Sequence, residues 1–317
     1  MMGIVMKRKR PAWYYLNLIT FALLCFILFG STTYAGVMTI AHTRPARASI
    51  CCSTPSDWGF VYDNVTISTS DGLKLSGWYL PSKNGAAVIL LHGYGASRQH
   101  MSAHAIMLAS QGFGVLMYDL RGHGESEGEI ASYGWMDIYD VEGAIEYLLS
   151  RPDVDPQRIG IFGFSVGGQA ALGAATRYRT LNAVAADGPG FFTTADIPPT
   201  NFFKDLIRWP TDQIFMSMME WRTGVSHPLS LSTAIATIAP RPLLLISAGM
   251  GAESQQVDYY YALAGKPKQL WNIPEAWHGG GVLMRSNEYG STLAGFFNES
   301  LNQFPLILST RKSVETP

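Results

Sequence analysis

The chain has 317 residues, of which 47% are hydrophobic and 15% are charged, and its formal net charge is −1 at pH 7. This apolar content is enough for one large hydrophobic core. Because no basic stripe occurs beyond the first residues, the composition excludes the charge pattern of a nucleic-acid-binding protein. Three cysteines are too few for a disulfide framework.

The N-terminus has the pattern of a membrane anchor. A tail, 1–12, carries four basic residues at 7–10, and the nearly uncharged apolar stretch 13–40 exceeds the roughly 20 residues that cross a bilayer as a helix. The excess of basic residues before this stretch predicts a cytoplasmic N-terminus. We therefore expect a single-pass protein of the cell membrane with an extracytoplasmic domain. The alternative is a secreted protein, cleaved near the small residues Thr33 and Ala35.

The globular part begins with a predicted hairpin. Two alternating runs, 64–69 and 73–80, flank Asp71 and Gly72, and Asp-Gly between such runs is typical of a two-residue turn. Apolar runs then occur alone, each followed by a helical pattern, at 86–91, 114–118, 159–162, 183–186 and 243–246. Strands that are apolar on both faces belong to a covered parallel sheet. The predicted fold is α/β, a mostly parallel sheet with helices on both faces and an antiparallel N-terminal hairpin.

One long segment, 191–238, interrupts this alternation and is predicted to be a helical cap inserted over the strand ends. It is rich in Met and aromatic residues, namely Phe202, Phe203, Trp209, Phe215, Met216, Met218, Met219 and Trp221. The predicted organisation is therefore a basic tail (1–12), a transmembrane anchor (13–40), a linker (41–57), a globular domain (58–305) that contains the cap, and a C-terminal tail (306–317).

A nucleophile motif follows the third of the buried strands. Gly163-Phe164-Ser165-Val166-Gly167 fits G-x-S-x-G, in which a serine lies on a sharp turn between a strand and a helix. Here an apolar run precedes the motif and helix-forming residues follow it. Small residues flank the serine because larger ones would clash with the neighbouring strand and helix. We interpret Ser165 as a nucleophile.

A serine hydroxyl needs a base that accepts its proton. In folds with this motif the base comes after the last strand, and His278 follows the predicted last strand, 268–273. His227 lies in the predicted cap and is a weaker candidate. His92 and His123 precede the serine and have structural explanations.

The third member of such a site is a carboxylate that orients the base. Glu253 is the first carboxylate in the glycine-rich loop after the strand at 243–246, and we assign it this role. Asp258, on a predicted helix further along, and Asp187, after the preceding strand, are alternatives.

The first strand of the parallel run ends in His92-Gly93-Tyr94-Gly95. Its glycines allow the backbone to approach a reacting carbonyl group. The backbone N–H groups of Tyr94 and Val166 are therefore expected to form an oxyanion hole, which stabilises a transition state by about 3 kcal/mol per donor.

Together these motifs resemble the α/β-hydrolase superfamily over about 61–304. They are His92-Gly93, Asp119-x-Arg121-Gly122-His123-Gly124-x-Ser126, the Ser165 motif and His278-Gly279, in that order. The run Pro240-Arg241-Pro242-Leu243-Leu244-Leu245-Ile246 and Glu253 also resemble bacterial membrane-anchored hydrolases of the esterase and S9-peptidase-like type. The chain departs from the pattern at the acid, because many relatives carry an Asp a few residues after the strand, whereas this loop is longer.

The resemblance implies neither a metal nor an organic cofactor, and the sequence contains no common metal or phosphate motif. We expect a membrane-anchored serine hydrolase that cleaves a carboxylic ester or a related acyl bond of a small-molecule substrate. The cap favours an apolar acyl or aryl group. The alternatives are an acyltransferase or peptidase with the same three residues, or a non-catalytic membrane-tethered binding module. The presence of both Ser165 and His278 argues against the last.

Overall fold

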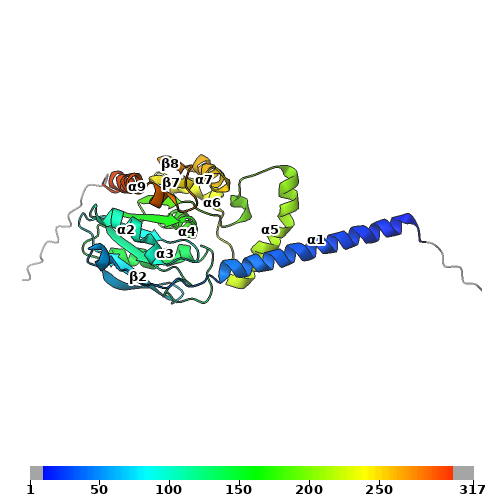
Figure 1. The fold of residues 1–317 in the computed structure, drawn as a ribbon, viewed down its shortest axis with the longest axis horizontal. Helices are drawn as coiled ribbons and strands as arrows, with labels where there is room; N and C mark the ends of the chain where they lie inside the picture. Colours follow the sequence, from blue (N-terminus) through cyan, green and yellow to red (C-terminus); the bar gives the residue numbers. More distant parts are fainter. Residues whose placement is uncertain (1–9, 303–317) are drawn as a thin grey trace, which may run out of the picture. The chain divides into compact units, whose positions relative to one another are not determined.

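The computed structural model describes residues 10–302 (Figure 1). The basic residues at 7–9 and the predicted C-terminal tail, 306–317, lie outside them. The described residues form two compact units. One contains the chain up to Ala41 together with Pro199–Val225, and the other contains His42–Pro198 together with the chain from Ser226 onward.

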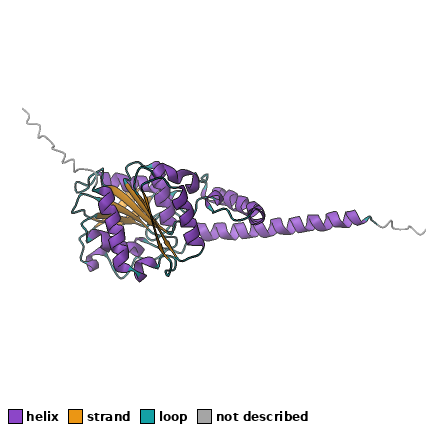
Figure 2. Cartoon of the chain, turned by 90° about the horizontal axis from the view of Figure 1, so that it is seen from above, coloured by secondary structure: helices purple, strands orange, loops and turns teal. Residues whose placement is uncertain are grey.

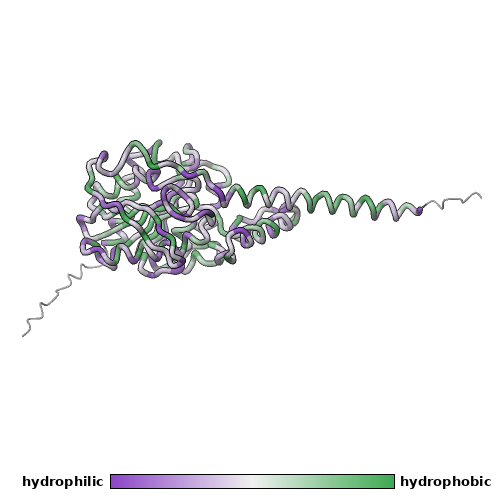
Figure 3. The backbone as a smooth tube through the Cα atoms, turned by 90° about the horizontal axis from the view of Figure 1, so that it is seen from below, coloured by the Kyte–Doolittle hydropathy of each residue, from purple (hydrophilic) through white to green (hydrophobic). Residues whose placement is uncertain are grey.

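The first unit is built from two long helices. Helix α1 (Ala12–Thr43) includes the whole predicted anchor, and it is long and apolar enough to cross a membrane. Figure 3 shows the nearly continuous hydrophobic character of this helix. Helix α5 (Phe202–Thr223) belongs to the same unit and begins at an N-cap, because the side chain of Asn201 accepts a hydrogen bond from the backbone N–H of Lys204 at 2.9 Å.

The second unit contains an eight-stranded sheet with the order β1-β2-β4-β3-β5-β6-β7-β8. The strands are β1 (Asp63–Ser68), β2 (Lys74–Leu80), β3 (Ala87–Leu91), β4 (Gly114–Tyr118), β5 (Ile159–Phe164), β6 (Ala183–Asp187), β7 (Leu243–Ala248) and β8 (Lys268–Ile273). Strand β2 pairs antiparallel with β1 and β4, and the remaining pairs are parallel. The predicted mostly parallel sheet with an antiparallel start is confirmed.

The central strands are buried along their whole length, as their apolar sequences predicted. Every residue of β3, β4, β6 and β7 is buried, because helices cover the sheet on both sides (Figure 2). These helices and turns are η1 (Pro55–Trp58), η2 (Arg98–Met101), α2 (Ser102–Ala109), α3 (Asp137–Leu149), α4 (Val166–Arg177), η3 (Thr194–Asp196), α6 (Leu231–Ala234), η4 (Ile235–Ile238), α7 (Ala252–Leu263), α8 (Gly281–Met284) and α9 (Ser286–Leu301).

The helices pack in groups against the sheet. Helix α2 contacts α9, α3 contacts α4, and α6 contacts both α4 and α7. On the side of α2 and α9, the core contains Leu90 and Phe162 from the strands with Leu108 and Phe297 from the two helices. Because parallel strands all end at the same edge, this arrangement brings the residues after β3, β5, β6, β7 and β8 together.

The segment that joins α1 to the sheet is bound to the second unit along its course. The backbone carbonyl of Thr43 accepts a hydrogen bond from the N–H of Ala131. Arg47 Nη1 donates to the carbonyl of Ser126 and Nη2 to that of Gly128, both at 2.6 Å. The predicted linker, 41–57, therefore includes the end of α1 and the start of η1. Between these two elements, Arg47 is hydrogen-bonded to the loop that contains Ser126 and Gly128.

The predicted cap segment, 191–238, is helical in the structure and holds η3, α5, α6 and η4. Its middle part, Pro199–Val225, belongs to the first unit, whereas its two ends belong to the second. Its role over the strand ends remains a prediction.

Candidate active site

Ser165 lies on the turn between β5 and α4. Its φ is 55° and its ψ is −119°, a backbone conformation that is rare for a residue with a side chain. Val166 is the first residue of α4, so the serine sits at a helix N-terminus, where the macrodipole favours negative charge. The strained turn predicted for this motif is present.

The glycines of the turn are required by close backbone contacts. A Cβ atom on Gly163 would overlap the carbonyl of Gly167, and one on Gly167 would overlap the carbonyls of Leu91 and His92 at the end of β3. Helix α4 can therefore approach the sheet this closely only with glycine at both positions. The turn and the end of β3 are held against each other.

The loop after β3 passes next to the serine. A Cβ on Gly93 would lie 3.2 Å from Ser165 Cβ, so the backbone that leads into Tyr94 runs beside the nucleophile motif. His92 is fully buried and fastens this loop to the end of β4, because its Nε2 accepts the N–H of Leu120 at 3.0 Å and its Nδ1–H donates to the carbonyl of Gly93 at 2.7 Å. Burial lowers the pKa of His92 to about 3, so this imidazole is neutral.

The structure brings His278 and Glu253 into direct contact. His278 Nδ1 lies 2.7 Å from Glu253 Oε2, and the other carboxylate oxygen accepts the N–H of Ala248 at 2.7 Å. Glu253 stands in the first turn of α7, where the helix N-terminus favours a carboxylate. The hydrogen bond to Glu253 raises the pKa of His278 above its usual value.

The imidazole of His278 lies next to the serine turn. It stacks on Phe164, the residue before Ser165, with ring centroids 4.8 Å apart. Its exposed fraction is 48%, so one side is open to an incoming molecule. Within residues 10–302, no hydrogen bond joins Ser165 Oγ to His278. Such bonds are often long in unliganded hydrolytic sites and tighten when a substrate is bound.

The alternative residues have other partners. Asp187 is buried at the end of β6, where its carboxylate accepts the hydroxyl of Tyr289 at 2.7 Å and its backbone carbonyl accepts the N–H of Ser165 at 2.8 Å. Burial raises the pKa of Asp187 to about 6. Asp258 is exposed on α7, and His227 is exposed with its ring 6.3 Å from that of Trp135.

The polar loop after β4 stabilises the edge of this region. Arg98 forms a buried ion pair with Asp119 at 2.6 Å, and Arg121 Nε donates to Asp140 on α3 at 2.7 Å. Ser126 Oγ donates to the carbonyl of Asp119 at 2.6 Å. These residues bind one another and so hold the loop in place.

An aromatic group that the sequence motifs did not indicate borders the site. Tyr133 has a positive φ of 52°, and its ring lies 6.4 Å from that of Tyr94, 4.4 Å from that of His42 and 6.2 Å from that of Phe191. Trp135 Nε1 donates to the carbonyl of Phe192 at 3.1 Å. We call Tyr133, Trp135 and these contacting rings the aromatic rim.

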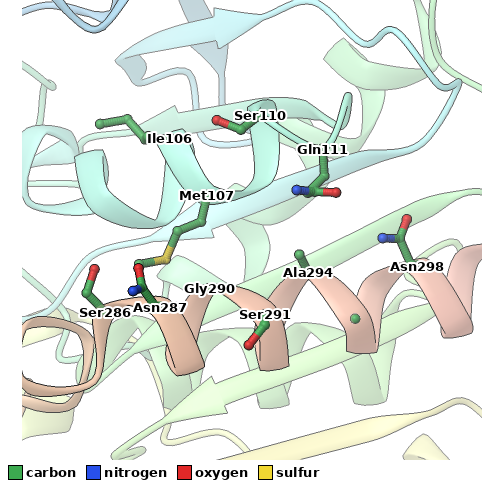
Figure 4. Close-up of a pocket in the computed structure, with 11 residues that line it drawn as sticks. Ile106, Met107, Ser110, Gln111, Ser286, Asn287, Gly290, Ser291, Ala294 and Asn298 are labelled. Carbon is green, nitrogen blue, oxygen red and sulfur yellow. The ribbon is translucent and has the colours of Figure 1, made fainter.

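A separate surface groove of about 580 Å³ lies between α2 and α9 (Figure 4). Met107 from α2, Gln111 from the turn after it, and Asn287 and Asn298 from α9 line it, and it includes none of the residues predicted for the site. Among residues 10–302, no group of three or more His, Cys, Asp or Glu side chains is arranged to hold a metal ion.

Comparison with known proteins agrees with this geometry. The family model described as serine aminopeptidase, S33, matches residues 82–239. The uncharacterized protein YfhR of Escherichia coli O157:H7 is 31% identical over 265 residues, which are 78% of this chain and 84% of that protein. The thiohydrolase aneE of Aspergillus aculeatus is 38% identical over 120 residues, 36% of this chain and 37% of that protein.

Among solved structures, the esterase Pf2001 of Pyrococcus furiosus matches with a TM-score of 0.67 and 26% identity, over 82% of this chain and 98% of that one. The likeness to YfhR and to this esterase extends over most of each chain, well beyond the short motifs. In addition, this chain has an eight-stranded sheet in which β5 leads into the strained turn at Ser165. We conclude that this chain is a hydrolase of the α/β-hydrolase superfamily, as its motifs predicted.

Proposed function

We propose that this protein is a membrane-anchored serine hydrolase that cleaves a carboxylic ester or a related acyl bond through an acyl-enzyme on Ser165. The observation that carries this proposal is the position of His278, which contacts Glu253 and packs its ring against Phe164, the residue that precedes Ser165. A base oriented by a carboxylate next to a serine on a strained turn is the arrangement needed to activate a hydroxyl group.

The proposed reaction has two halves. Ser165 Oγ attacks the carbonyl carbon while His278 takes its proton, and the N–H groups of Tyr94 and Val166 stabilise the oxyanion. The bond to the leaving group then breaks, and His278 returns the proton to that group. Water, deprotonated by His278, attacks the acyl-enzyme and restores Ser165. Glu253 keeps the imidazole oriented and stabilises its positive charge.

An acyl bond to oxygen or sulfur is the substrate favoured by the relatives. One similar structure is an esterase, and one similar sequence is a thiohydrolase. The serine hydroxyl, the base and the oxyanion donors serve esters and thioesters alike, because both pass through a tetrahedral intermediate with the same developing negative charge.

The activity is expected to depend on pH through His278. Only the neutral imidazole can accept the serine proton, and Glu253 raises the pKa of His278 by favouring the charged form. A raised pKa moves the acidic limb of the kcat/KM profile to higher pH. We therefore expect the inflection above 6.5, the ordinary value for histidine, in initial-rate measurements with a soluble ester. An inflection below that value would contradict the assignment of this pair.

A fluorophosphonate probe tests the proposed nucleophile. We expect the folded full-length protein to bind one phosphonyl group per chain, with loss of fluoride, and Ser165→Ala to bind none. Peptide mass spectrometry should locate the group on Ser165. As a control, Ser247→Ala changes a buried serine near the end of strand β7 and should label normally. Absence of labelling in the folded wild-type protein would favour a non-catalytic binding module.

A further inference from the structure

Helix α5 exposes large apolar side chains on one stripe. Phe202 is 72% exposed, Phe203 73% and Trp209 62%, and Leu206 is exposed between them. Positions 202, 206 and 209 recur at helical spacing, so they share one side of α5. An apolar stripe of this kind is unfavourable in water and marks a surface that contacts lipid or another protein.

Polar residues cover the rest of the same half-helix. Arg208 Nε lies 2.8 Å from Asp212, and Thr200 Oγ1 donates to Asp205 at 2.8 Å. Lys204 is exposed close by. A short helical segment with Phe, Leu and Trp on one side and charged residues on the other is typical of helices that lie in the interface of a bilayer.

Contacts with α1 place α5 at one level of the membrane anchor. Thr211 Oγ1 donates to Ser31 Oγ at 2.8 Å, and a Cβ on Gly36 would lie 3.9 Å from Met218 Sδ. A span that starts near Trp13 uses roughly 20 residues to cross the hydrocarbon, so Ser31 falls near its outer edge. Figures 1 and 2 both show α5 beside the C-terminal part of α1, and in Figure 1 its N-terminal end points away from α1.

This level of α1 is where Trp and Phe side chains are stable at a membrane surface. Thr211, near the middle of α5, contacts Ser31, and the stripe from Phe202 to Trp209 lies on the N-terminal side of this contact. We take lipid to be what covers this stripe. The reason is that α5 contacts α1, which is the helix long and apolar enough to cross a bilayer.

The chain passes between the two units three times, and each passage is close in sequence to a ring that packs within the second unit. His42, at the end of α1, makes an edge-to-face contact with Tyr133 of the aromatic rim, and Phe191, on the way to α5, contacts the same ring. After α5 the chain returns through His227, whose ring is 6.3 Å from that of Trp135. The first two of these connections therefore contact Tyr133, whose ring lies 6.4 Å from that of Tyr94, in the loop that runs next to Ser165.

We propose that the Phe202–Trp209 stripe of α5 lies in the bilayer surface beside α1, and that the site at Ser165 takes as substrate an ester or thioester whose acyl chain is dissolved in that bilayer. The choice of substrate rests on the proposed function, whereas the position of α5 does not. Three covalent connections join the unit that contains α1 and α5 to the unit that contains Ser165, so the nucleophile is tethered to the bilayer that would hold its substrate.

The position of α5 is tested by tryptophan fluorescence in full-length protein reconstituted into vesicles that contain brominated phosphatidylcholine. Bromine quenches tryptophan only by contact within the bilayer. We expect Trp209→Phe to lower the quenched fraction of the emission, because it removes a lipid-exposed ring. Trp271→Phe, which changes a ring packed on the core of the second unit, is the matched control and should raise that fraction. An unchanged or higher fraction in Trp209→Phe would overturn the proposed position.

The substrate class is tested with two p-nitrophenyl esters, soluble acetate and palmitate dissolved in phosphatidylcholine vesicles. We expect the triple variant Phe202→Ser, Phe203→Ser, Leu206→Ser to lower kcat/KM for the palmitate by about tenfold or more and to leave the acetate rate unchanged. The matched control, Lys204→Ser, changes the polar side of the same helix and should affect neither ester. Circular dichroism checks that each variant is folded.

The outcomes separate the two proposals. Equal effects of the triple variant on both esters, or no effect on either, would overturn the lipid-substrate proposal while the hydrolase assignment stands. Failure of the wild-type protein to cleave either ester or to react with fluorophosphonate would overturn the proposed function and the substrate class together. In that case the quenching result alone decides the position of α5.

Discussion

His278→Ala is expected to lower kcat by about 10⁶-fold, the loss seen when one member of a serine–histidine pair is removed from a hydrolase. The reason is that His278 is the base proposed for Ser165. Among the described residues, the imidazole of His278 is the one that stacks on Phe164 beside the serine turn. The measurement is steady-state kcat on a chromogenic ester, with circular dichroism to show that the variant is folded.

The combination Ser165→Ala, His278→Ala tests whether the two residues act as a unit. We expect the double variant to retain the same residual rate as either single variant, because the oxyanion donors and substrate binding remain. His227→Ala is the matched control, since His227 is exposed and its ring contacts Trp135. A large loss in His227→Ala with a small loss in His278→Ala would transfer the role of base to His227.

Glu253→Gln is expected to lower kcat by about 10⁴-fold with the fold unchanged. The amide is nearly the same size as the carboxylate, and its oxygen can still accept the N–H of Ala248. It can no longer stabilise the positive charge that His278 acquires, and it can hold the wrong tautomer of the ring. The substitution therefore separates the electrostatic role of Glu253 from its packing, and kcat on the same ester measures the loss.

Two other carboxylates serve as comparisons for this prediction. Asp258→Asn, on the exposed side of α7, is expected to be near normal. Asp187→Asn should cause a far smaller loss than Glu253→Gln, because an amide oxygen can still accept the hydroxyl of Tyr289. Near-normal turnover in Glu253→Gln, combined with a large loss in either comparison variant, would move the acid to that residue.

The strands could be predicted from sequence because their signal is local. A run such as Leu243–Ala248 is apolar at every position, and such a run has few stable places other than the middle of a covered sheet. The hairpin at Asp71-Gly72 is equally local. The order of the strands is different, because crossovers depend on packing across the whole sheet, and no short pattern indicates that β4 lies between β2 and β3.

The site could be predicted in part for a related reason. The turn at Ser165 has strict steric requirements, so it leaves a short signature of small residues. The choice between Glu253 and Asp187 was open because both follow strands that end at the same sheet edge. In the structure their partners differ: the carboxylate of Asp187 accepts the hydroxyl of Tyr289, 102 residues away, whereas that of Glu253 contacts His278. A single tyrosine in an amphipathic helix gives no sign of such a partner.

The contact between Thr211 and Ser31 joins residues 180 positions apart, and it could not be predicted for the same reason. The aromatic residues of 202–221 did indicate an unusual segment, and the sequence suggested a cap. The exposure of the rings on α5, and the position along α1 at which α5 makes contact, depend on the three-dimensional structure of the two helices. Apolar composition alone does not distinguish a side chain that faces substrate from one that faces lipid.

The attachment of Arg47 has a practical consequence for work on a detergent-free version of the enzyme. Its guanidinium bonds the carbonyls of Ser126 and Gly128, in the loop that also holds Asp119 in place. A shortened protein that starts at the first turn, Pro55, would lose this brace and the bond from Ala131 to Thr43. A fragment without the apolar helix should therefore begin at or before His42, so that it keeps Thr43 and Arg47 and their hydrogen bonds.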